Sequence, residues 1–530
     1  MSMWKVVALA AAVGVIAPMT LAQESTQDLR KEIEALKRDM NRLKAENQAL
    51  AENMKNSAVA DTSLEERINA LSENLDYAGT TVKSDANPIT IFGQFRTRSG
   101  WTFDRDFGAD FGSSDIEDDD GSFVDALFLV GFDFSLEKDV TTRFSIKSNG
   151  LYNNGDTNAN DAADGLGEVD LYEGWINIGN IFGRKELSAK EGRQEIVLGN
   201  EFQFGNNDYF SGETFDGSHW MWDGESFNLH FLWAKLAIDD NFDTRNWPYN
   251  NAGTGNGYDD DELYSLYFTY EGIQDHTIDL YWIYFNGHNG GSMGTLGNGL
   301  GSFSTGDVAT DGGGFDFYTH TFGLRIGGCF AVAEGLDYNV EFAYQLGDLA
   351  DTPVGLNDDV EGFTVEVELG ITFDATNHFR LFVRFLYAEG ADGDDTGYIP
   401  LFPERHAQAV AGDHRSRRAR YGAMDIIPMD NVLTVQLGLT FDPAADWTLG
   451  LTALYAEHDE DVVTGPLSTD DGLGFEIDAF AEYRYSTQTT FSGGIGVFFP
   501  EDGAPLDGGG FAGADDDIAF LFYMQARVVF

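Results

Sequence analysis

The stretch GFTVEVELGITFDATNHFRLFVRFLY, residues 362–387, contains two runs in which every second residue is apolar. Side chains of a β-strand point alternately to opposite faces, so each run presents one apolar face and one largely polar face. The tight turn at residues 374–377 makes the two runs neighbours in an antiparallel hairpin. Each run is about 11 residues long, which is the length that a tilted strand needs to cross a bilayer. Because a soluble sandwich can show the same alternation, the rest of the sequence has to distinguish these two classes.

Composition narrows the class of protein. The chain has 530 residues, including 62 glycines but 11 prolines, and 14% of its residues are aromatic. A formal net charge of −57 argues against nucleic acid as a partner, because an acidic protein repels a phosphate backbone. The single cysteine, Cys329, excludes an internal disulfide and a cysteine-rich metal site. Beyond the N-terminal region, no run of about 18 apolar residues predicts a membrane-spanning helix.

The N-terminus has the pattern of a secretory signal peptide. Residues 1–5 are short and positively charged, and residues 6–17 form an apolar run. Small residues then occupy the positions that precede Gln23, as they do before a cleavage site. The pattern predicts a signal peptide over residues 1–22 and therefore an exported protein. An uncleaved membrane anchor is the alternative interpretation.

Residues 23–78 show a helical period instead. Apolar residues recur at two heptad positions: Leu29, Leu36, Leu43, Leu50, Leu64 and Leu71 at one, and Ile33, Met40, Met54, Ile68 and Leu75 at the other. This spacing predicts a short periplasmic coiled coil, with a homotrimer as the expected assembly. A single helix folded back on its own domain is the alternative. Residues 79–87 then form a linker to the next domain.

From residue 88 to residue 530 the chain is a series of alternating segments. We count about 18 of them, an even number within the range of bacterial outer-membrane barrels. Long Gly- and Asp-rich loops such as 287–314 alternate with short turns such as 442–445. A barrel with extracellular loops on one rim and periplasmic turns on the other has this arrangement. The last segment, 518–530, ends in Phe530, which resembles the assembly signal of bacterial outer-membrane proteins.

The sequence therefore predicts an all-β fold: a transmembrane antiparallel β-barrel of about 18 strands, preceded by a short N-terminal α-helical coiled coil. The expected location is the bacterial outer membrane, with its lipid and lipopolysaccharide as surroundings. A barrel of this size encloses a lumen, because side chains alone cannot fill it. We expect passive diffusion of polar or charged solutes, including anionic oligo- or polysaccharide. The alternative is a structural protein whose coiled coil tethers the membrane to the periplasmic layer.

The polar faces of the predicted strands supply candidate residues for the lumen and the solute path. These are Arg96, Arg98, Arg143, Lys147, Glu366, Glu368, Arg380 and Arg384. Pairing between such groups across neighbouring strands is the alternative to contact with a solute. In the opening hairpin, acids on the first strand face arginines on the second. The sequence leaves open whether those charges pair or face the solute.

One long loop, residues 398–430, is basic within an otherwise acidic protein. Its candidate path residues are Arg405, Arg415, Arg417, Arg418 and Arg420. If the loop folds inward, it constricts the pore, and its guanidinium groups attract carboxylate, sulfate or phosphate. A solvated external loop and contact with lipopolysaccharide phosphates are the two alternatives.

Two patterns bear on cofactors and catalysis. Asp156, Asn158 and Asn160 place oxygen ligands at alternate positions, as calcium loops do, but the expected Gly and Glu further along are missing. Calcium in the acidic external loops is one interpretation and solubilising charge is the other; we expect no other cofactor. The GGSMG stretch at 290–294 matches GxSxG but lies in a Gly-rich loop without the required strand and helix. No nucleophile–base spacing predicts an enzyme.

Two pairs of short segments resemble the alginate-export family of outer-membrane porins. GRQEIVLG at 192–199, followed by TFDG at 214–217, is similar to the family's GRQE…G…TFDG pattern. LFPERH at 401–406, with YGAMD at 421–425, is similar to a later F-P…H…G…D segment. The resemblance implies an eighteen-stranded barrel with a charged, arginine-bearing conduit for an anionic polysaccharide. By motif it also implies that Arg193, Asp216 and Arg405 belong to that conduit.

Overall fold

The computed structural model describes a single compact unit within Thr80–Phe530. The described residues are 81–83, 88–103, 121–137, 139–151, 169–206, 212–237, 261–287, 316–330, 335–350, 359–373, 378–391, 396–407, 418–460, 463–464, 467–468, 472–501 and 518–530. The predicted signal peptide and coiled coil lie outside these residues. Part of the predicted linker forms a short strand, β1 (Thr81–Lys83), which pairs with β2.

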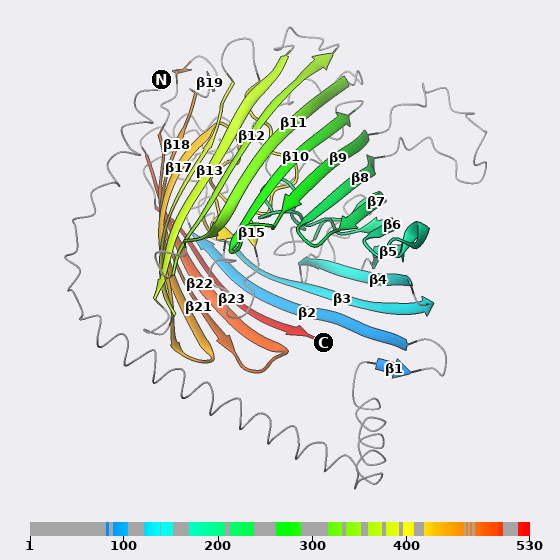
Figure 1. Cartoon of the computed structure of the whole chain (residues 1–530). Coiled ribbons are helices and arrows are strands. Elements are labelled where there is room, and N and C mark those ends of the chain that lie inside the picture. The colour runs from blue at the N-terminus through cyan, green and yellow to red at the C-terminus, as the bar shows by residue number, and fades with distance from the viewer. Residues whose placement is uncertain are drawn as a thin grey trace, which may run out of the picture. The chain divides into compact units, whose positions relative to one another are not determined.

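Eighteen strands form a closed antiparallel barrel, as the sequence predicts (Figure 1). The strands are β2 (Pro88–Phe103), β3 (Gly121–Glu137), β4 (Val140–Leu151), β5 (Asp170–Ile178), β6 (Leu187–Gln194), β7 (Phe215–Asp223), β8 (Phe227–Ala237), β9 (Asp261–Tyr270), β10 (His276–Gly287), β11 (Asp316–Cys329), β12 (Leu336–Ala350), β13 (Asp359–Phe373), β14 (Phe379–Ala388), β17 (Val432–Ala444), β18 (Trp447–His458), β21 (Gly472–Arg484), β22 (Thr489–Pro500) and β23 (Ala519–Val529). The barrel closes where β2 pairs with β23, so that neither terminal strand of the wall is left with an unpaired edge.

The described remainder consists of small elements. A 3-10 turn, η1 (Ile181–Gly183), lies between β5 and β6. Two short hairpins complete the list: β15 (His406–Ala407) with β16 (Arg418–Ala419), and β19 (Val463–Thr464) with β20 (Leu467–Ser468). Among the described residues, no helix is long and apolar enough to cross a membrane.

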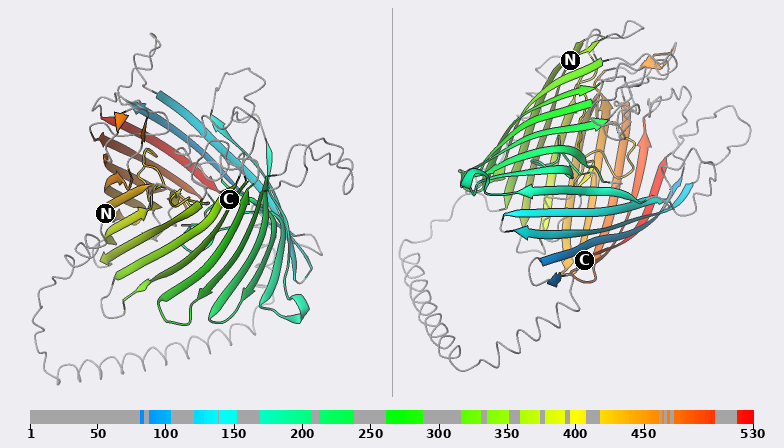
Figure 2. Two further views of the ribbon diagram at one scale, coloured as in Figure 1. Left: turned by 90° about the horizontal axis from the view of Figure 1, so that it is seen from above. Right: turned by 90° about the vertical axis from the view of Figure 1, so that its right-hand side faces the viewer.

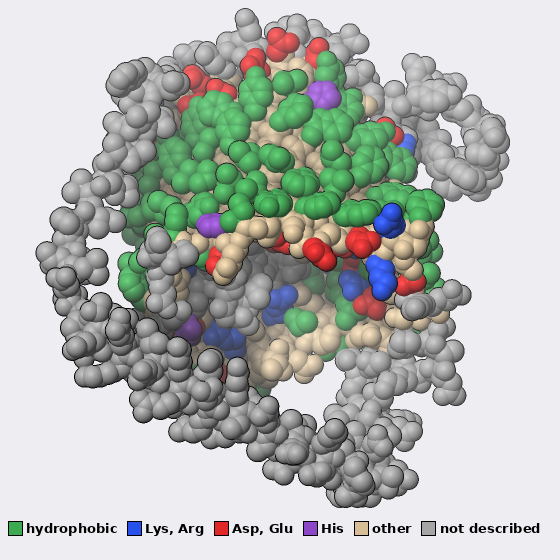
Figure 3. All heavy atoms as spheres, in the orientation of Figure 1, with side chains coloured by type: hydrophobic (Ala, Val, Ile, Leu, Met, Phe, Trp, Pro, Cys, Tyr) green, Lys and Arg blue, Asp and Glu red, His purple; other side chains and the backbone are tan. Residues whose placement is uncertain are grey.

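The two faces of the wall differ as the alternation predicts. In the hairpin β13–β14, Leu369, Phe373 and Leu381 are exposed on the outer face, whereas Glu366 and Arg380 are 1% exposed on the inner face. Figure 3 shows hydrophobic side chains covering the outer face over β9 to β12. Lipid surrounds such a face in a membrane barrel, so its apolar side chains need no protein cover.

Aromatic pairs lie on the outer face towards both ends of the barrel. Tyr264 and Tyr284 are 6.1 Å apart between ring centroids on the side of the long connections, and Trp447 stacks on Tyr483 at 4.8 Å on the side of the short turns. Aromatic girdles of this kind mark the two membrane–water interfaces of outer-membrane barrels. We refer below to the end that carries the short turns, such as those at 224–226 and 445–446, as the short-turn rim.

Candidate functional site

The described parts of two long connections leave the wall and fold into the barrel (Figure 2). We call residues 195–206 the first inward loop and the described part of residues 396–430 the second inward loop. They pair in parallel: the Phe402 amide donates to the Gln203 carbonyl at 3.2 Å, and the Gly205 amide donates to the Phe402 carbonyl at 2.8 Å. For the described part of the second loop, the inward interpretation of the sequence is therefore the one that the structure adopts.

An aromatic cluster packs the two loops against the wall. Phe204 of the first loop stacks on Phe402 of the second at 6.0 Å between ring centroids. Phe215, at the start of β7, meets both rings edge-on at 6.1 and 5.0 Å. All three rings are buried. Aromatic pairs contribute about 0.5–1.5 kcal/mol each beyond the area that they bury, so the loops are packed like a protein core.

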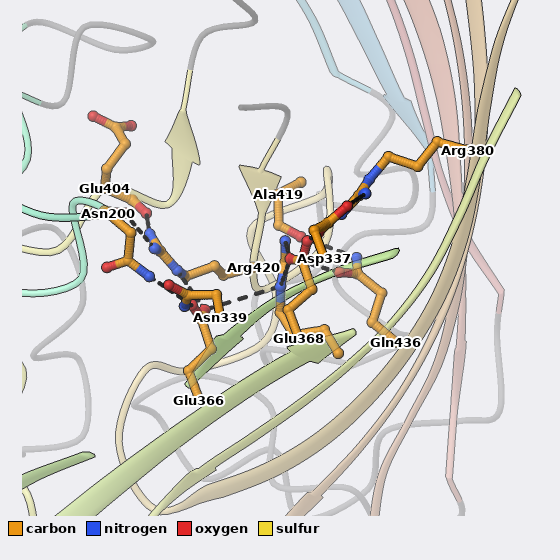
Figure 4. Close-up of polar contacts among 11 residues, drawn as sticks. Asn200, Asp337, Asn339, Glu366, Glu368, Arg380, Glu404, Ala419, Arg420 and Gln436 are labelled. Atoms are coloured by element: carbon orange, nitrogen blue, oxygen red, sulfur yellow. Dashed lines mark hydrogen bonds and ion pairs between the residues drawn. The ribbon is translucent and has the colours of Figure 1, made fainter. Parts of the chain in front are cut away.

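Arg420 links both loops to the wall (Figure 4). Its Nε donates to Glu366 Oε2 on β13 at 2.7 Å, and its side chain is fully buried. Its Nη2 donates to the Asn200 carbonyl at 2.6 Å, and its Nη1 donates to the Glu404 carbonyl at 2.8 Å. Asn200 Nδ2 completes the cluster by donating to Glu366 Oε1 at 2.9 Å. The guanidinium of Arg420 therefore donates hydrogen bonds to three separate parts of the chain: β13 and the two inward loops.

The other charges of the β13–β14 hairpin pair with one another. Arg384 Nη2 lies 2.6 Å from Glu368 Oε2 and Arg380 Nη2 lies 2.8 Å from Glu368 Oε1. Arg380 also binds Asp337 on β12, and Arg384 Nη1 donates to Gln436 on β17 at 2.7 Å. All these side chains are buried. The question that the sequence left open has an answer here: the hairpin charges pair off.

A second anchor holds the far end of the second loop. Glu476 Oε1 on β21 accepts hydrogen bonds from the amides of Ala423 and Met424 at 2.6 and 3.0 Å. Gly422 has a φ of +83°, and a Cβ at this position would lie 2.4 Å from Glu476 Oε1. Glycine is therefore required here both by the backbone conformation and by the close approach of the carboxylate.

Of the remaining arginines in the second connection, the structure describes Arg405 and Arg418. Arg405 Nε lies 3.2 Å from Asp425 Oδ1, and its Nη2 donates to the Ile427 carbonyl at 2.7 Å. Arg405 therefore binds within the second inward loop itself. Arg418 contributes its backbone to β16, which pairs with β15. Arg415 and Arg417 lie outside the described residues.

The opposite side of the lumen is basic. Arg98 Nε donates to Asp125 at 2.9 Å, and Arg143 binds Asp133 at 2.7 Å and Glu173 at 3.0 Å. The Lys147 ammonium lies 3.4 Å from the centroid of the Tyr172 ring. We define the basic wall by its cations on β2, β4 and β23: Arg96, Arg98, Arg143, Lys147 and Arg527. Figure 3 shows Lys and Arg side chains within a hollow below the apolar outer face.

Strand parity places Arg193 and Asp216 on the outer face. They form an ion pair at 2.6 Å, and both are well exposed. Arg193 pairs with Gly174, which pairs with Phe144, an outward residue that is 47% exposed. Phe215 is buried in the interior, so the next residue along the strand points outward. The expectation that these two residues line the conduit is not met, because the motif match carries no information on which face they occupy.

Two loop carboxyl groups have raised pKa values. Burial raises the pKa of Glu404 to about 7, against an ordinary value of 4.5, with Glu201 adding to the effect. Burial and the charge of Glu404 likewise raise the pKa of Glu213 to about 7.

The predicted calcium ligands, residues 156–160, lie outside the described residues. Within the described residues, no group of three or more His, Cys, Asp or Glu side chains is arranged to hold a metal ion.

The sequence patterns did not point to two residues that share the inner wall with Arg143. Trp175 on β5 and Lys190 on β6 contact one another, with the ammonium 4.7 Å from a ring centroid. Lys190 lies three residues before Arg193, in a segment whose apolar alternation is weak. Without a clear alternation, its face could not be assigned from the sequence.

Comparison with known protein families gives one match. The sequence model of the family described as "Alginate export" matches residues 88–459, which includes both inward loops. No curated protein matches the sequence. Among solved structures, OccK11 (OpdR) of Pseudomonas aeruginosa is similar with a TM-score of 0.48 and 10% identity, covering 83% of this chain and 96% of that one.

Two further solved structures have comparable scores. OccD3 (OpdP) of Pseudomonas aeruginosa has a TM-score of 0.46 and 11% identity, covering 83% of this chain and 91% of that one. OmpT, an outer membrane protein of Vibrio cholerae, has a TM-score of 0.40 and 11% identity, covering 85% of this chain and 99% of that one.

Proposed function

The chain belongs to the alginate export family of outer-membrane channels, and on this premise we propose that it conducts anionic oligo- or polysaccharide along its basic wall. The inward loops occupy one side of the lumen, and the basic wall lies on the other. A polyanion would use the second side, because the charges on the first already neutralise each other.

One observation carries this proposal. The protein as a whole has a net charge of −57, yet β2, β4 and β23 contain no Asp or Glu and carry the five cations of the basic wall. Arg96 on β2 even lies directly opposite Arg527 on β23, so two like charges are neighbours across the closing seam. Like charges directly opposite each other destabilise a sheet, and an anionic solute in the lumen would relieve their repulsion. A charged wall within a low-dielectric barrel also concentrates counter-ions.

The cations are distributed along the depth of the barrel. Arg143 lies near the short-turn rim, Arg96 lies further along the wall, and Arg98 lies closer to the long loops. Conduction requires several sites of moderate strength, so that a solute can enter and also leave. The acid partners of Arg98 and Arg143 fix these guanidinium groups in place and moderate their attraction for a passing carboxylate.

Electrical recording tests the proposal. The full-length protein, reconstituted in a planar bilayer under a salt gradient, is expected to give a reversal potential that shows anion preference. An oligogalacturonate, which is an anionic oligosaccharide of uronate units, is expected to block the current reversibly. Cation preference together with absence of block would overturn the proposal. A membrane tether with a sealed barrel, the structural alternative, would give no conductance at all.

A further inference from the structure

A compact group of side chains occupies the inner wall near the short-turn rim. Trp175 lies three residues before the end of β5, and Lys190 lies three residues after the start of β6. Trp175 is directly opposite Arg143, and Lys190 is directly opposite Asn177, which lies on the same face of β5 as Trp175. Since paired residues share a face, Arg143, Trp175 and Lys190 all project into the barrel.

The indole ring is held in one orientation. Trp175 Nε1 donates to Glu173 Oε1 at 2.9 Å, and Glu173 Oε2 accepts from Arg143 Nη1 at 3.0 Å. Lys190 Nζ lies 4.7 Å from the centroid of the Trp175 ring, and Arg143 Cζ lies 5.4 Å from it. Both Trp175 and Lys190 are half-buried, so neither is sealed from the lumen.

The carboxylates of Glu173 and Glu195 lie near Lys190 and attract it electrostatically. The two oxygens of Glu173 are occupied by Arg143 and by the indole, and the carboxylate of Glu195 accepts hydrogen bonds from Tyr172 and Asn206. Within the part of the chain that the structure describes, no carboxylate forms an ion pair with Lys190. Its neighbour across β6–β7 is His219, which is not an acid. The aromatic ring stabilises this half-buried ammonium by a cation–π contact, and the ammonium keeps hydrogen-bond donors for an anion from the lumen.

Strand β6 places no side chain directly opposite the indole. Gly192 is directly opposite Trp175 and has a φ of +120°. A Cβ at this position would lie 2.2 Å from the Gly174 carbonyl oxygen, so only glycine fits. Because glycine has no side chain, the same-face neighbours of the ring on β6 are the two diagonal residues, Lys190 and Gln194.

We propose that Trp175 and Lys190 form an entry subsite for an acidic sugar residue of the polymer. The Lys190 ammonium binds the sugar carboxylate, and the indole packs against the apolar face of the sugar ring. The short-turn rim of an outer-membrane barrel faces the periplasm, so this is the first ring of the wall that an exported chain meets. The subsite rests on the proposed function and extends it, because it specifies where recognition begins and which chemical class is recognised.

Block of the reconstituted full-length channel by oligogalacturonate tests the subsite. Lys190→Gln is expected to raise the concentration for half-block from the short-turn side by about tenfold, the scale of one charge-assisted contact. Lys190→Arg retains the charge and is expected to restore block. Trp175→Leu should weaken block as well, since it removes the ring platform. Lys185→Gln, an exposed lysine in the turn between β5 and β6, is the matched control and should behave as the wild type.

The two hypotheses fail in different ways. If the wild-type channel is not blocked by oligogalacturonate, the proposed function fails and the subsite fails with it. If the wild type is blocked and both Lys190→Gln and Trp175→Leu are blocked equally well, the subsite alone is wrong. A neutral maltooligosaccharide is the companion probe: Lys190→Gln should leave its weak block unchanged, and an equal loss for both sugars would show a general distortion of the wall and contradict the subsite.

Discussion

Arg420 Nε lies 2.7 Å from Glu366 Oε2, and this ion pair joins the second inward loop to the middle of β13. Neither side chain is accessible to solvent beyond 1%. The same guanidinium also donates hydrogen bonds to backbone carbonyls of both inward loops, so this ion pair holds both loops against β13. Its loss should therefore be visible in both the stability and the conductance of the channel.

Arg420→Met should detach the inward loops while leaving the wall closed. Removing one partner of a buried pair leaves an uncompensated charge and costs about 3–5 kcal/mol. We expect a higher and noisier single-channel conductance, together with a lower urea midpoint for the loss of tertiary structure. Arg184→Met, at an exposed turn, is the control. Wild-type conductance and midpoint in Arg420→Met would contradict the assigned role.

Gly422→Ala should weaken the anchor at Glu476. The added methyl group meets the carboxylate at 2.4 Å, and the φ of +83° is strained for alanine. Gly183→Ala is a matched control: its φ is +74°, but a Cβ there meets nothing within 4 Å. Both variants carry the backbone strain, and only Gly422→Ala carries the clash. Hydrogen exchange at the Ala423 and Met424 amides should rise in Gly422→Ala alone; equal exchange in the two variants would argue against the anchor.

Docking of the inward loops should weaken as pH rises. Glu404 and Glu213 have pKa values raised to about 7, so the docked loops favour the protonated carboxyl groups. A released carboxyl has its ordinary pKa of 4.5, and the docked state therefore loses stability progressively between about pH 4.5 and pH 7 and levels off above that range. Glu201, His406 and Arg420 also face Glu404; the two basic groups oppose the shift and the acid adds to it.

Hydrogen exchange of the loop amides at pH-corrected rates measures this dependence. Protection of the Phe402 amide should be greater at pH 5 than at pH 8. Glu404→Gln removes one of the two ionisable groups and should reduce the difference, and Glu213 should account for what remains. A wild-type protein whose corrected protection is the same at both pH values would disprove the linkage.

Ion selectivity distinguishes the inner wall from the outer face. Arg143→Gln removes a cation from the basic wall and should shift the reversal potential towards cations. Arg193→Gln removes an exposed arginine from the outward ion pair, so the reversal potential should stay within error of the wild type. A large shift in Arg193→Gln would restore the motif-based placement and refute the placement by strand parity.

The wall of the barrel is predictable from sequence because lipid imposes a simple rule. A strand that faces hydrocarbon must be apolar at every second residue, and the hairpin at 362–387 satisfies this rule without exception on its outer face. The structure places both strands as the alternation predicts, with β13 ending at Phe373 and β14 starting at Phe379.

The contacts of the inward loops and of the inner wall follow no such periodic rule. Arg420 and Asn200 are 220 residues apart, and no periodicity connects them. The cluster of arginines in the second loop predicted attraction for anions, yet the buried Arg420 binds the protein's own carbonyls and Glu366. Trp175 and Lys190 were missed for a related reason: their significance depends on which neighbouring acids are already occupied, and occupancy is a property of three-dimensional contacts.

The parallel contact between Gln203 and Phe402 also constrains the order of assembly. Residues so distant in sequence lose much chain entropy before their contacts stabilise them, and eight wall strands, β7 to β14, lie between the two loops. Neighbouring strands pair locally, so we expect the loops to meet only once the arc from β7 to β14 has formed. In a refolding time course, β-sheet circular dichroism should therefore develop before protection of the Phe402 amide, and the interior should be the last part of the protein to become ordered.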